Sequence, residues 1–253
     1  MLKTRVIPCL LVQNGRLVKT IQFRNPAYIG DPVNAIKIYN GKEVDELILL
    51  DITATLEHRK PNLVFLSEVA NECFMPLTYG GGVRDLDDLK RIFGLGIEKV
   101  AINSYALENP AFIERSASLF GSQSILVSMD VKRGLFGKYR VFGEGGRKTS
   151  EQDPVSWAIQ MEKAGAGEIL LTAMDRDGLM EGYDTVLLRK VTAAVHIPVI
   201  ACGGAGRLQD FRAAVIEGGA SAVAAGSMVV YQGRNKGVLI NFPQQDDLKQ
   251  LFD

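Results

Sequence analysis

The stretch Glu46-Leu-Ile-Leu-Leu returns 122 residues later as Glu168-Ile-Leu-Leu. The same offset relates two further pairs of motifs: Pro76 and Pro198, and Gly81-Gly82 and Gly203-Gly204. Unrelated segments do not keep one register over three motifs. The chain is therefore interpreted as a duplicated half, with a glycine-rich loop after a buried strand in each copy. Such a chain predicts two similar sites on one face, suited to a ligand with similar groups at both ends.

Short apolar runs alternate with amphipathic stretches along the whole chain. The expected strands cover 5–11, 47–51, 75–79, 99–103, 124–130, 169–173, 198–202 and 221–225, and helical patterns between them include 32–39, 62–71, 86–93, 110–120, 154–164 and 208–216. Eight strand–helix alternations predict an α/β fold of the (β/α)8 barrel type. An open doubly wound sheet is the alternative, but its halves do not normally repeat so evenly. Because no linker interrupts the pattern, residues 1–253 are expected to form one domain.

Composition narrows the possible functions. The formal net charge of the 253 residues is zero and the pI is near 6.8, which gives no electrostatic footprint for nucleic acid or an anionic membrane. Three cysteines without metal-ligand spacing fit a reducing cytosol, and two histidines do not favour a metal site. The apolar N-terminal run is too short for a signal or membrane segment. We expect a cytoplasmic protein without a metal or cofactor.

Two connections are too long to be simple turns. Residues 12–31 follow the first expected strand, and residues 131–153 follow the fifth. Both leave the C-terminal ends of strands, where barrel enzymes place their lids and their chemistry. Loop growth without function is the alternative, which the charged and glycine-rich character of both segments disfavours.

Glycine-rich turns follow related strands in the two halves. Glycines let backbone N–H groups converge on an anion, and the next helix adds its positive N-terminus. One such loop would be weak evidence, because glycine also serves tight turns. Two related loops, each near a serine at a strand end, predict a ligand with two phosphates. The expected phosphate-binding residues are Gly81, Gly82, Asn103 and Ser104 in the first half, and Gly203, Gly204, Gly226 and Ser227 in the second.

Seven motifs together resemble one known family. They are Arg5-Val-Ile-Pro-Cys-Leu, Asp51-Ile-Thr-Ala, Gly80-Gly-Gly-Val-Arg, Ile102-Asn-Ser, Gly165-Ala-Gly-Glu-Ile-Leu-Leu-Thr, Met174-Asp-Arg-Asp-Gly and Gly203-Gly-Ala-Gly. They are similar to motifs of the HisF family, the cyclase subunits of imidazole glycerol phosphate synthase, from residue 1 to about residue 231. The resemblance implies a lyase subunit built as a (β/α)8 barrel. It also implies that a HisH-type glutaminase docks at the N-terminal barrel face. Its ammonia would cross the barrel to a bisphosphate nucleotide-like substrate.

The chain departs from the family at one position where chemistry is expected. The family's first strand ends in a catalytic aspartate, and this chain has Leu11 there. The family's other catalytic carboxylate matches Asp130. A leucine carries no proton, so half of a pair of general acid–base groups is absent. Lys19 and Asp177 are the remaining candidates for catalytic residues, Lys19 as a loop residue that closes over the substrate. Asp51 is a weaker candidate to replace the lost carboxylate.

Four charged residues are expected at the other end of the barrel. Because strand side chains alternate, Arg5 faces inward if Leu11 does. Glu46, Lys99 and Glu168 open three other strands with the same parity. All four match the positions of the family's charged ammonia gate. A salt-bridged plug that merely closes the barrel is the alternative interpretation.

The complete gate and the incomplete acid–base pair favour an ammonia-conducting subunit that serves other chemistry. Four segments resemble HisF-like paralogues of surface-polysaccharide pathways: Gly15-Arg-Leu-Val-Lys-Thr, Leu135-Phe-Gly-Lys-Tyr, Ala224-Ala-Gly-Ser-Met and Val238-Leu-Ile-Asn-Phe-Pro. That resemblance implies a second partner, an ATP-dependent amidotransferase that converts an N-acetyl group of a sugar into an acetamidino group. The alternatives are the histidine-pathway cyclase, with a substitute for the missing carboxylate, and a catalytically idle scaffold.

Overall fold

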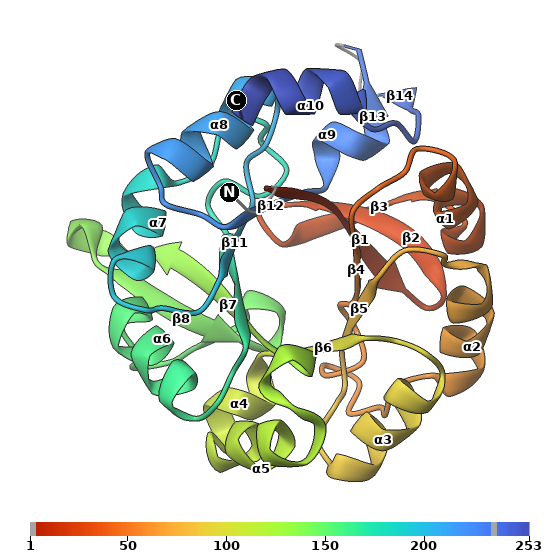
Figure 1. Cartoon of the computed structure of the whole chain (residues 1–253). Helices are drawn as coiled ribbons and strands as arrows, with labels where there is room; N and C mark the ends of the chain where they lie inside the picture. Colours follow the sequence, from red (N-terminus) through yellow and green to blue (C-terminus); the bar gives the residue numbers. More distant parts are fainter. Residues whose placement is uncertain (1–3, 234–236, 253) are drawn as a thin grey trace.

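Eight parallel strands close into a barrel in the computed structural model, which describes residues 4–233 and 237–252. The strands follow the order of the chain, and the last of them pairs with the first to close the cylinder (Figure 1). They are β1 (Arg5–Gln13), β4 (Leu47–Asp51), β5 (Leu77–Gly80), β6 (Lys99–Ile102), β7 (Ile125–Arg133), β10 (Glu168–Ala173), β11 (Val199–Cys202) and β12 (Ala222–Ala225). The predicted (β/α)8 fold is confirmed.

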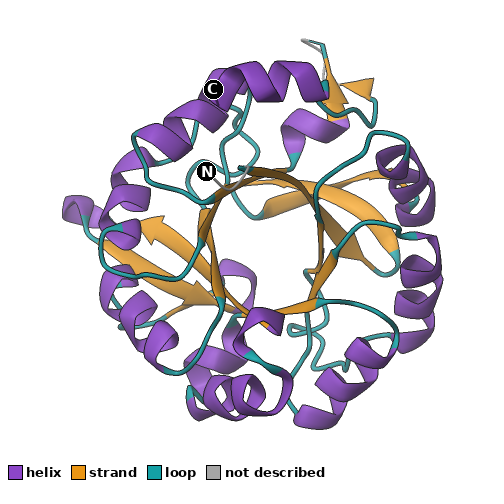
Figure 2. Ribbon diagram, in the orientation of Figure 1, coloured by secondary structure: helices purple, strands orange, loops and turns teal. Residues whose placement is uncertain are grey.

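Helices surround the barrel on the outside (Figure 2). The main ones are α1 (Pro32–Asn40), α2 (Leu63–Glu72), α3 (Leu86–Gly94), α5 (Ala111–Phe120), α6 (Pro154–Lys163), α7 (Thr185–Thr192), α8 (Leu208–Ile216) and α10 (Gln245–Phe252). Five of them begin at an Asp or Asn whose side chain accepts a backbone N–H of the first turn, at Asp31, Asn62, Asp85, Asp153 and Asp184. Two of these helices, α7 and α10, lie outside the helical ranges predicted above.

The apolar residues form two layers. The larger one lies between the strands and the helices, around fully buried side chains such as Trp157 and Phe211. The smaller one fills the inside of the barrel with short or medium side chains, at Ile7, Cys9, Ile48, Ala101, Leu126, Leu170, Ile200, Ala222 and Ala224. This inner layer separates the two ends of the barrel, so each end has its own polar chemistry.

Both long connections are β-hairpins. The first contains β2 (Arg16–Ile21) and β3 (Arg24–Gly30), and β2 pairs with β1. The second contains β8 (Tyr139–Gly143), which pairs with β7, and β9 (Lys148–Thr149). The hairpins extend the barrel wall beyond the C-terminal ends of β1 and β7.

The remaining elements are short. They are α4 (Ser104–Glu108), α9 (Ser227–Val230), the strand pair β13 (Tyr231–Gln232) and β14 (Gly237–Val238), and the single turns η1 (Ser122–Ser124), η2 (Leu135–Gly137) and η3 (Glu144–Gly146). Among the described residues, no helix has both the length and the apolar character needed to cross a membrane.

Candidate functional site

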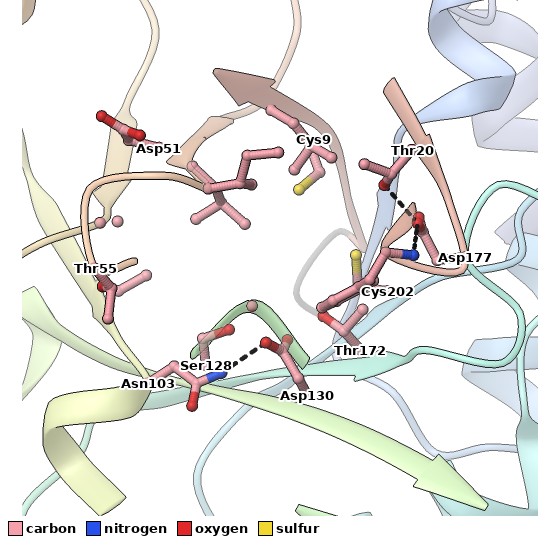
Figure 3. Close-up of a pocket in the computed structure, with 18 of the residues that line it drawn as sticks. Cys9, Thr20, Asp51, Thr55, Asn103, Ser128, Asp130, Thr172, Asp177 and Cys202 are labelled. Atoms are coloured by element: carbon pink, nitrogen blue, oxygen red, sulfur yellow. Dashed lines mark hydrogen bonds between the residues drawn. The ribbon is translucent and has the colours of Figure 1, made fainter. Parts of the chain in front are cut away.

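A cavity of about 230 Å³ opens at the C-terminal end of the barrel. Polar side chains line it from five of the eight barrel strands, β1, β4, β7, β10 and β11, and from the β2–β3 hairpin; Figure 3 shows several of them. All thirteen residues predicted to bind phosphate or to surround the reaction line it: Leu11, Lys19, Asp51, Asp130 and Asp177 together with the eight cradle residues. The structure thus collects residues from 11 to 227 of the chain in one place.

Asp130 is a buried carboxyl group on β7, in the wall of the cavity. Its Oδ2 accepts a hydrogen bond of 2.7 Å from the Asn103 side chain. Burial and, second, the negative charge of Asp177 raise the pKa of Asp130 to about 7, against the lowering effect of the Asn103 hydrogen bond. A carboxyl group with this pKa exchanges a proton near neutral pH, which suits a general acid or base.

Lys19 and Asp177 form an ion pair inside the cavity. Lys19 Nζ lies 2.8 Å from Asp177 Oδ1, and both side chains are buried. The other oxygen, Oδ2, accepts hydrogen bonds from the Thr20 hydroxyl at 2.8 Å and from the Phe23 backbone N–H. The pair joins the β2–β3 hairpin to the end of β10, which are 158 residues apart in the chain. Asp177 therefore has its hydrogen-bonding capacity occupied by the hairpin.

Asp51 also has partners of its own. Its Oδ1 accepts from the backbone N–H groups of Thr53 and Ala54, and the Arg59 guanidinium lies 3.1 Å from Oδ2. These bonds fold the loop after β4 and neutralise the carboxylate. Asp51 is thus a structural residue of the cavity wall rather than a free replacement for the aspartate missing at position 11.

Two thiols at the bottom of the cavity were not among the predicted site residues. Cys9 of β1 and Cys202 of β11 are both drawn in the cavity wall (Figure 3), and their side chains interact. This contact and burial raise the pKa of Cys9, and the same contact lowers the pKa of Cys202. Strand alternation could have placed Cys9 inside, because it has the same parity as Leu11. The contact with Cys202 had no signal in the sequence.

Close backbone contacts explain why the two cradles contain glycine. A Cβ on Gly81, where φ is 130°, would lie 2.6 Å from the Asp51 carbonyl oxygen. A Cβ on Gly204, where φ is 116°, would lie 2.2 Å from the Gly182 carbonyl oxygen. Within the part of the chain that the structure describes, the buried Ser227 hydroxyl has no hydrogen-bond partner. That hydroxyl is a donor available to an anion in the second cradle.

The four charged residues predicted at the opposite end contact one another. Arg5 donates to Glu46, at 2.5 Å, and to Glu168. Lys99 Nζ lies 3.0 Å from Glu46 Oε1 and 2.9 Å from Glu168 Oε2. Both carboxylates are almost fully buried, whereas Arg5 is 29% exposed and Lys99 19%. The result is an alternating ring of two cations and two anions, which we call the charged ring.

Several known proteins are similar in sequence to this chain over most of its length. Residues 5–236 match the family model described as histidine biosynthesis protein. The chain is 48% identical over 248 residues to the "Putative imidazole glycerol phosphate synthase subunit hisF2" of Pseudomonas aeruginosa, covering 98% of this chain and 99% of that one. It is 47% identical to the "Putative imidazole glycerol phosphate synthase subunit HisF" of Leptospira interrogans, over the full length of both. It is also 47% identical to the "Imidazole glycerol phosphate synthase subunit HisF" of Alkaliphilus metalliredigens, covering 91% and 92% of the two chains.

Proposed function

The chain belongs to the histidine biosynthesis protein family, as a HisF-type synthase subunit, and from this premise we propose that it conducts ammonia for a reaction other than the family's cyclisation. A HisH-type glutaminase at the N-terminal barrel face supplies the ammonia. The cytoplasmic acceptor is an N-acetylated sugar of surface-polysaccharide synthesis, and an ATP-dependent amidotransferase converts its acetamido group into an acetamidino group.

One observation carries this proposal: the two ends of the barrel differ in completeness. The charged ring at the N-terminal end has all four members, and each contacts both residues of opposite charge. At the C-terminal end Asp130 has the pKa of a proton carrier, but Leu11 occupies the position of its expected partner. Asp51 and Asp177 are each held in other hydrogen bonds. Delivery is thus supported better than cyclisation.

The interior between the two ends supports passage of a small neutral molecule. Several side chains of the inner layer are short, notably Ala101, Ala222 and Ala224. An apolar route favours NH3 over NH4+, because a buried cation without a partner costs several kcal/mol. The charged ring would then admit ammonia at one end while keeping bulk water and ions out of the interior.

Cyclisation in histidine biosynthesis is the second candidate. The observation in its favour is the complete set of eight cradle residues around the cavity, which suits a bisphosphate substrate. In this reading the bisphosphate and ammonia give imidazole glycerol phosphate and an aminoimidazole ribotide. Asp130 would act with a substitute partner, for which the Lys19–Asp177 pair is a candidate because the charge of Asp177 acts on Asp130.

A steady-state assay with the bisphosphate substrate and ammonium salt distinguishes the two functions. We expect wild-type turnover roughly 10²–10⁴-fold below that of a HisF enzyme, because one positioned proton carrier is missing. Leu11→Asp should raise the rate, and Leu11→Asn, which has the same size but no titratable group, should not. Wild-type turnover equal to that of a HisF enzyme would contradict the delivery function. No turnover even in Leu11→Asp would count against the cyclase. A scaffold without function predicts no stimulation of a glutaminase.

A further inference from the structure

The β7–β8 hairpin extends from the same end of the barrel as the cavity. Its tip, η2, protrudes beyond the ring of helices (Figure 1). The segment that follows β8 returns to the cavity, where Gly145 and Arg147 form part of the wall. A protein that contacted the hairpin would therefore lie beside the cavity mouth.

The tip of this hairpin displays an aromatic ring to solvent. The Phe136 side chain is 99% exposed, the highest value among the exposed large apolar residues of the described chain. Its backbone has φ of 63°, a left-handed conformation that costs a residue other than glycine about 1 kcal/mol or more. Two short-range hydrogen bonds fix the turn, from Gly134 N–H to the Lys138 carbonyl at 2.7 Å and from Gly137 N–H to the Gly134 carbonyl at 3.2 Å.

The pair of residues that flanks the tip, Arg133 and Tyr139, is anchored to the barrel. The Tyr139 hydroxyl donates to Asp184 at 2.8 Å, and the Lys190 ammonium lies 5.4 Å from the centroid of the Tyr139 ring. On the other strand, Arg133 N–H donates to Asp175 at 2.7 Å. A hairpin held next to its tip is already close to its bound geometry, so docking costs less ordering entropy.

The hairpin is strongly basic. Residues 131–143 include four cations and no carboxylate: Lys132, Arg133, Lys138 and Arg140. Across the described residues, none of these four forms an ion pair with another side chain of this chain. A cationic surface around an exposed aromatic ring is complementary to an acidic protein surface that has an apolar hollow.

From these features we infer that the β7–β8 hairpin docks an acidic protein that receives ammonia at the C-terminal end of the barrel. The inference rests on the proposed function, because only a delivery subunit needs a receiving enzyme at its exit. Docking beside the cavity mouth would keep the ammonia from escaping into water before it reacts. The Phe136 ring would enter the partner, and the four cations would set the salt dependence of the contact.

The test is the affinity of the full-length chain for the ATP-dependent amidotransferase of the same organism, measured by biolayer interferometry. We expect Phe136→Ser and Lys138→Glu each to raise Kd at least tenfold, and the wild-type Kd to rise between 50 and 500 mM salt. The control is Leu119→Ser, which removes another exposed apolar side chain, 61% exposed, near the end of α5 at the opposite end of the barrel. Its Kd should equal that of the wild type.

Three outcomes would overturn the inference. If both hairpin variants bind as tightly as the wild type, the docking surface is wrong while the delivery function stands. If the wild type does not bind and turns over the bisphosphate substrate like a HisF enzyme, both proposals fail together. If the wild type instead binds phosphatidylserine vesicles and Phe136→Ser abolishes that binding, the hairpin is a membrane contact.

Discussion

Leu11 lines the cavity, and charged side chains near it are held in ion pairs or hydrogen bonds with other residues. The Lys19 ammonium is paired with Asp177, and Asp51 is held by Arg59 and two backbone N–H groups. Asp130 accepts a hydrogen bond from the neutral Asn103 amide, while burial and the negative charge of Asp177 leave its own charge poorly compensated. The pKa of about 7 is the consequence of this isolation, and it links the catalytic character of Asp130 to the stability of the fold.

Replacing Asp130 by Asn should stabilise the fold, and more so at high pH. The unfolded carboxyl group loses its proton near its ordinary pKa of 3.8, whereas the folded one keeps it up to a pKa of about 7. The folded state binds more protons in this window, so wild-type stability falls as the pH rises from about 4 to 7. Asparagine has no such titration. The Tm gain of Asp130→Asn should therefore grow between pH 4 and 7 and then level off.

Calorimetry of the two proteins from pH 4.5 to 8.5 measures this gain. The exposed carboxyl of Asp246, 85% exposed, gives the control Asp246→Asn, whose Tm difference should stay small throughout. A gain for Asp130→Asn that does not change with pH would mean that Asp130 is not a buried proton carrier.

At the scale of single elements, the two turns of the β1–β2–β3 segment show which turns can be predicted from a sequence. Asn14-Gly15 forms the turn between β1 and β2 with φ of 50° and 73°, and Asn-Gly is the strongest short signal for such a turn. The next turn, between β2 and β3, uses Gln22 and Phe23 at φ of 50° and 64°. Neither residue favours a left-handed conformation, so this turn had no signal. Contacts with Asp177, far away in the sequence, hold it in place.

Asp177→Ala should release the β2–β3 hairpin from the barrel. The substitution removes hydrogen bonds to Lys19, Thr20 and the Phe23 backbone, and it leaves a left-handed turn without its support. Trypsin should then cleave after Arg16, Lys19 or Arg24 at least several times faster than in the wild type, as followed by mass spectrometry of the fragments.

Asp175→Ala is the matched control, because its side chain accepts from Arg133 N–H in the other hairpin. It should leave cleavage in the β2–β3 hairpin unchanged and increase cleavage near Arg133 and Lys138. Equal cleavage patterns in the two variants would show that Asp177 does not hold the first hairpin specifically.

For the whole molecule, sequence periodicity was sufficient to predict the structure wherever successive strands share one pattern. The half-repeat predicts the barrel, and strand alternation brings Arg5, Glu46, Lys99 and Glu168 to one end of its interior. Contacts between hairpins and barrel, such as Lys19 with Asp177, depend on three-dimensional closure and have no periodic pattern. The charged ring at the bottom of the barrel and the residues that line the cavity at its top were thus predictable from the sequence, whereas the contacts among the cavity residues need the structure.

The charged ring leads to a prediction about the passage of ammonia along the whole barrel. Removing Glu46 leaves Arg5 and Lys99 facing a single carboxylate, and breaking a buried pair typically costs about 3–5 kcal/mol. The ring would rearrange or admit water, so ammonia from the glutaminase would be lost before the inner layer. Glu46→Ala and Lys99→Ala should each lower glutamine-dependent product formation at least tenfold, while ammonium salt, which can enter from the cavity end, should support nearly normal rates.

The two nitrogen sources must be compared on the same purified complex, with circular dichroism to establish that each variant is folded. Lys249→Ala removes an ion pair with Asp246 on α10, where the two side chains are 63% and 85% exposed, and should affect neither rate. A gate and a plug differ in this comparison. A gate affects only the nitrogen that arrives through the barrel, whereas a plug that merely stabilises the fold affects both sources equally. Equal losses with glutamine and with ammonium salt would therefore assign the ring to stability alone.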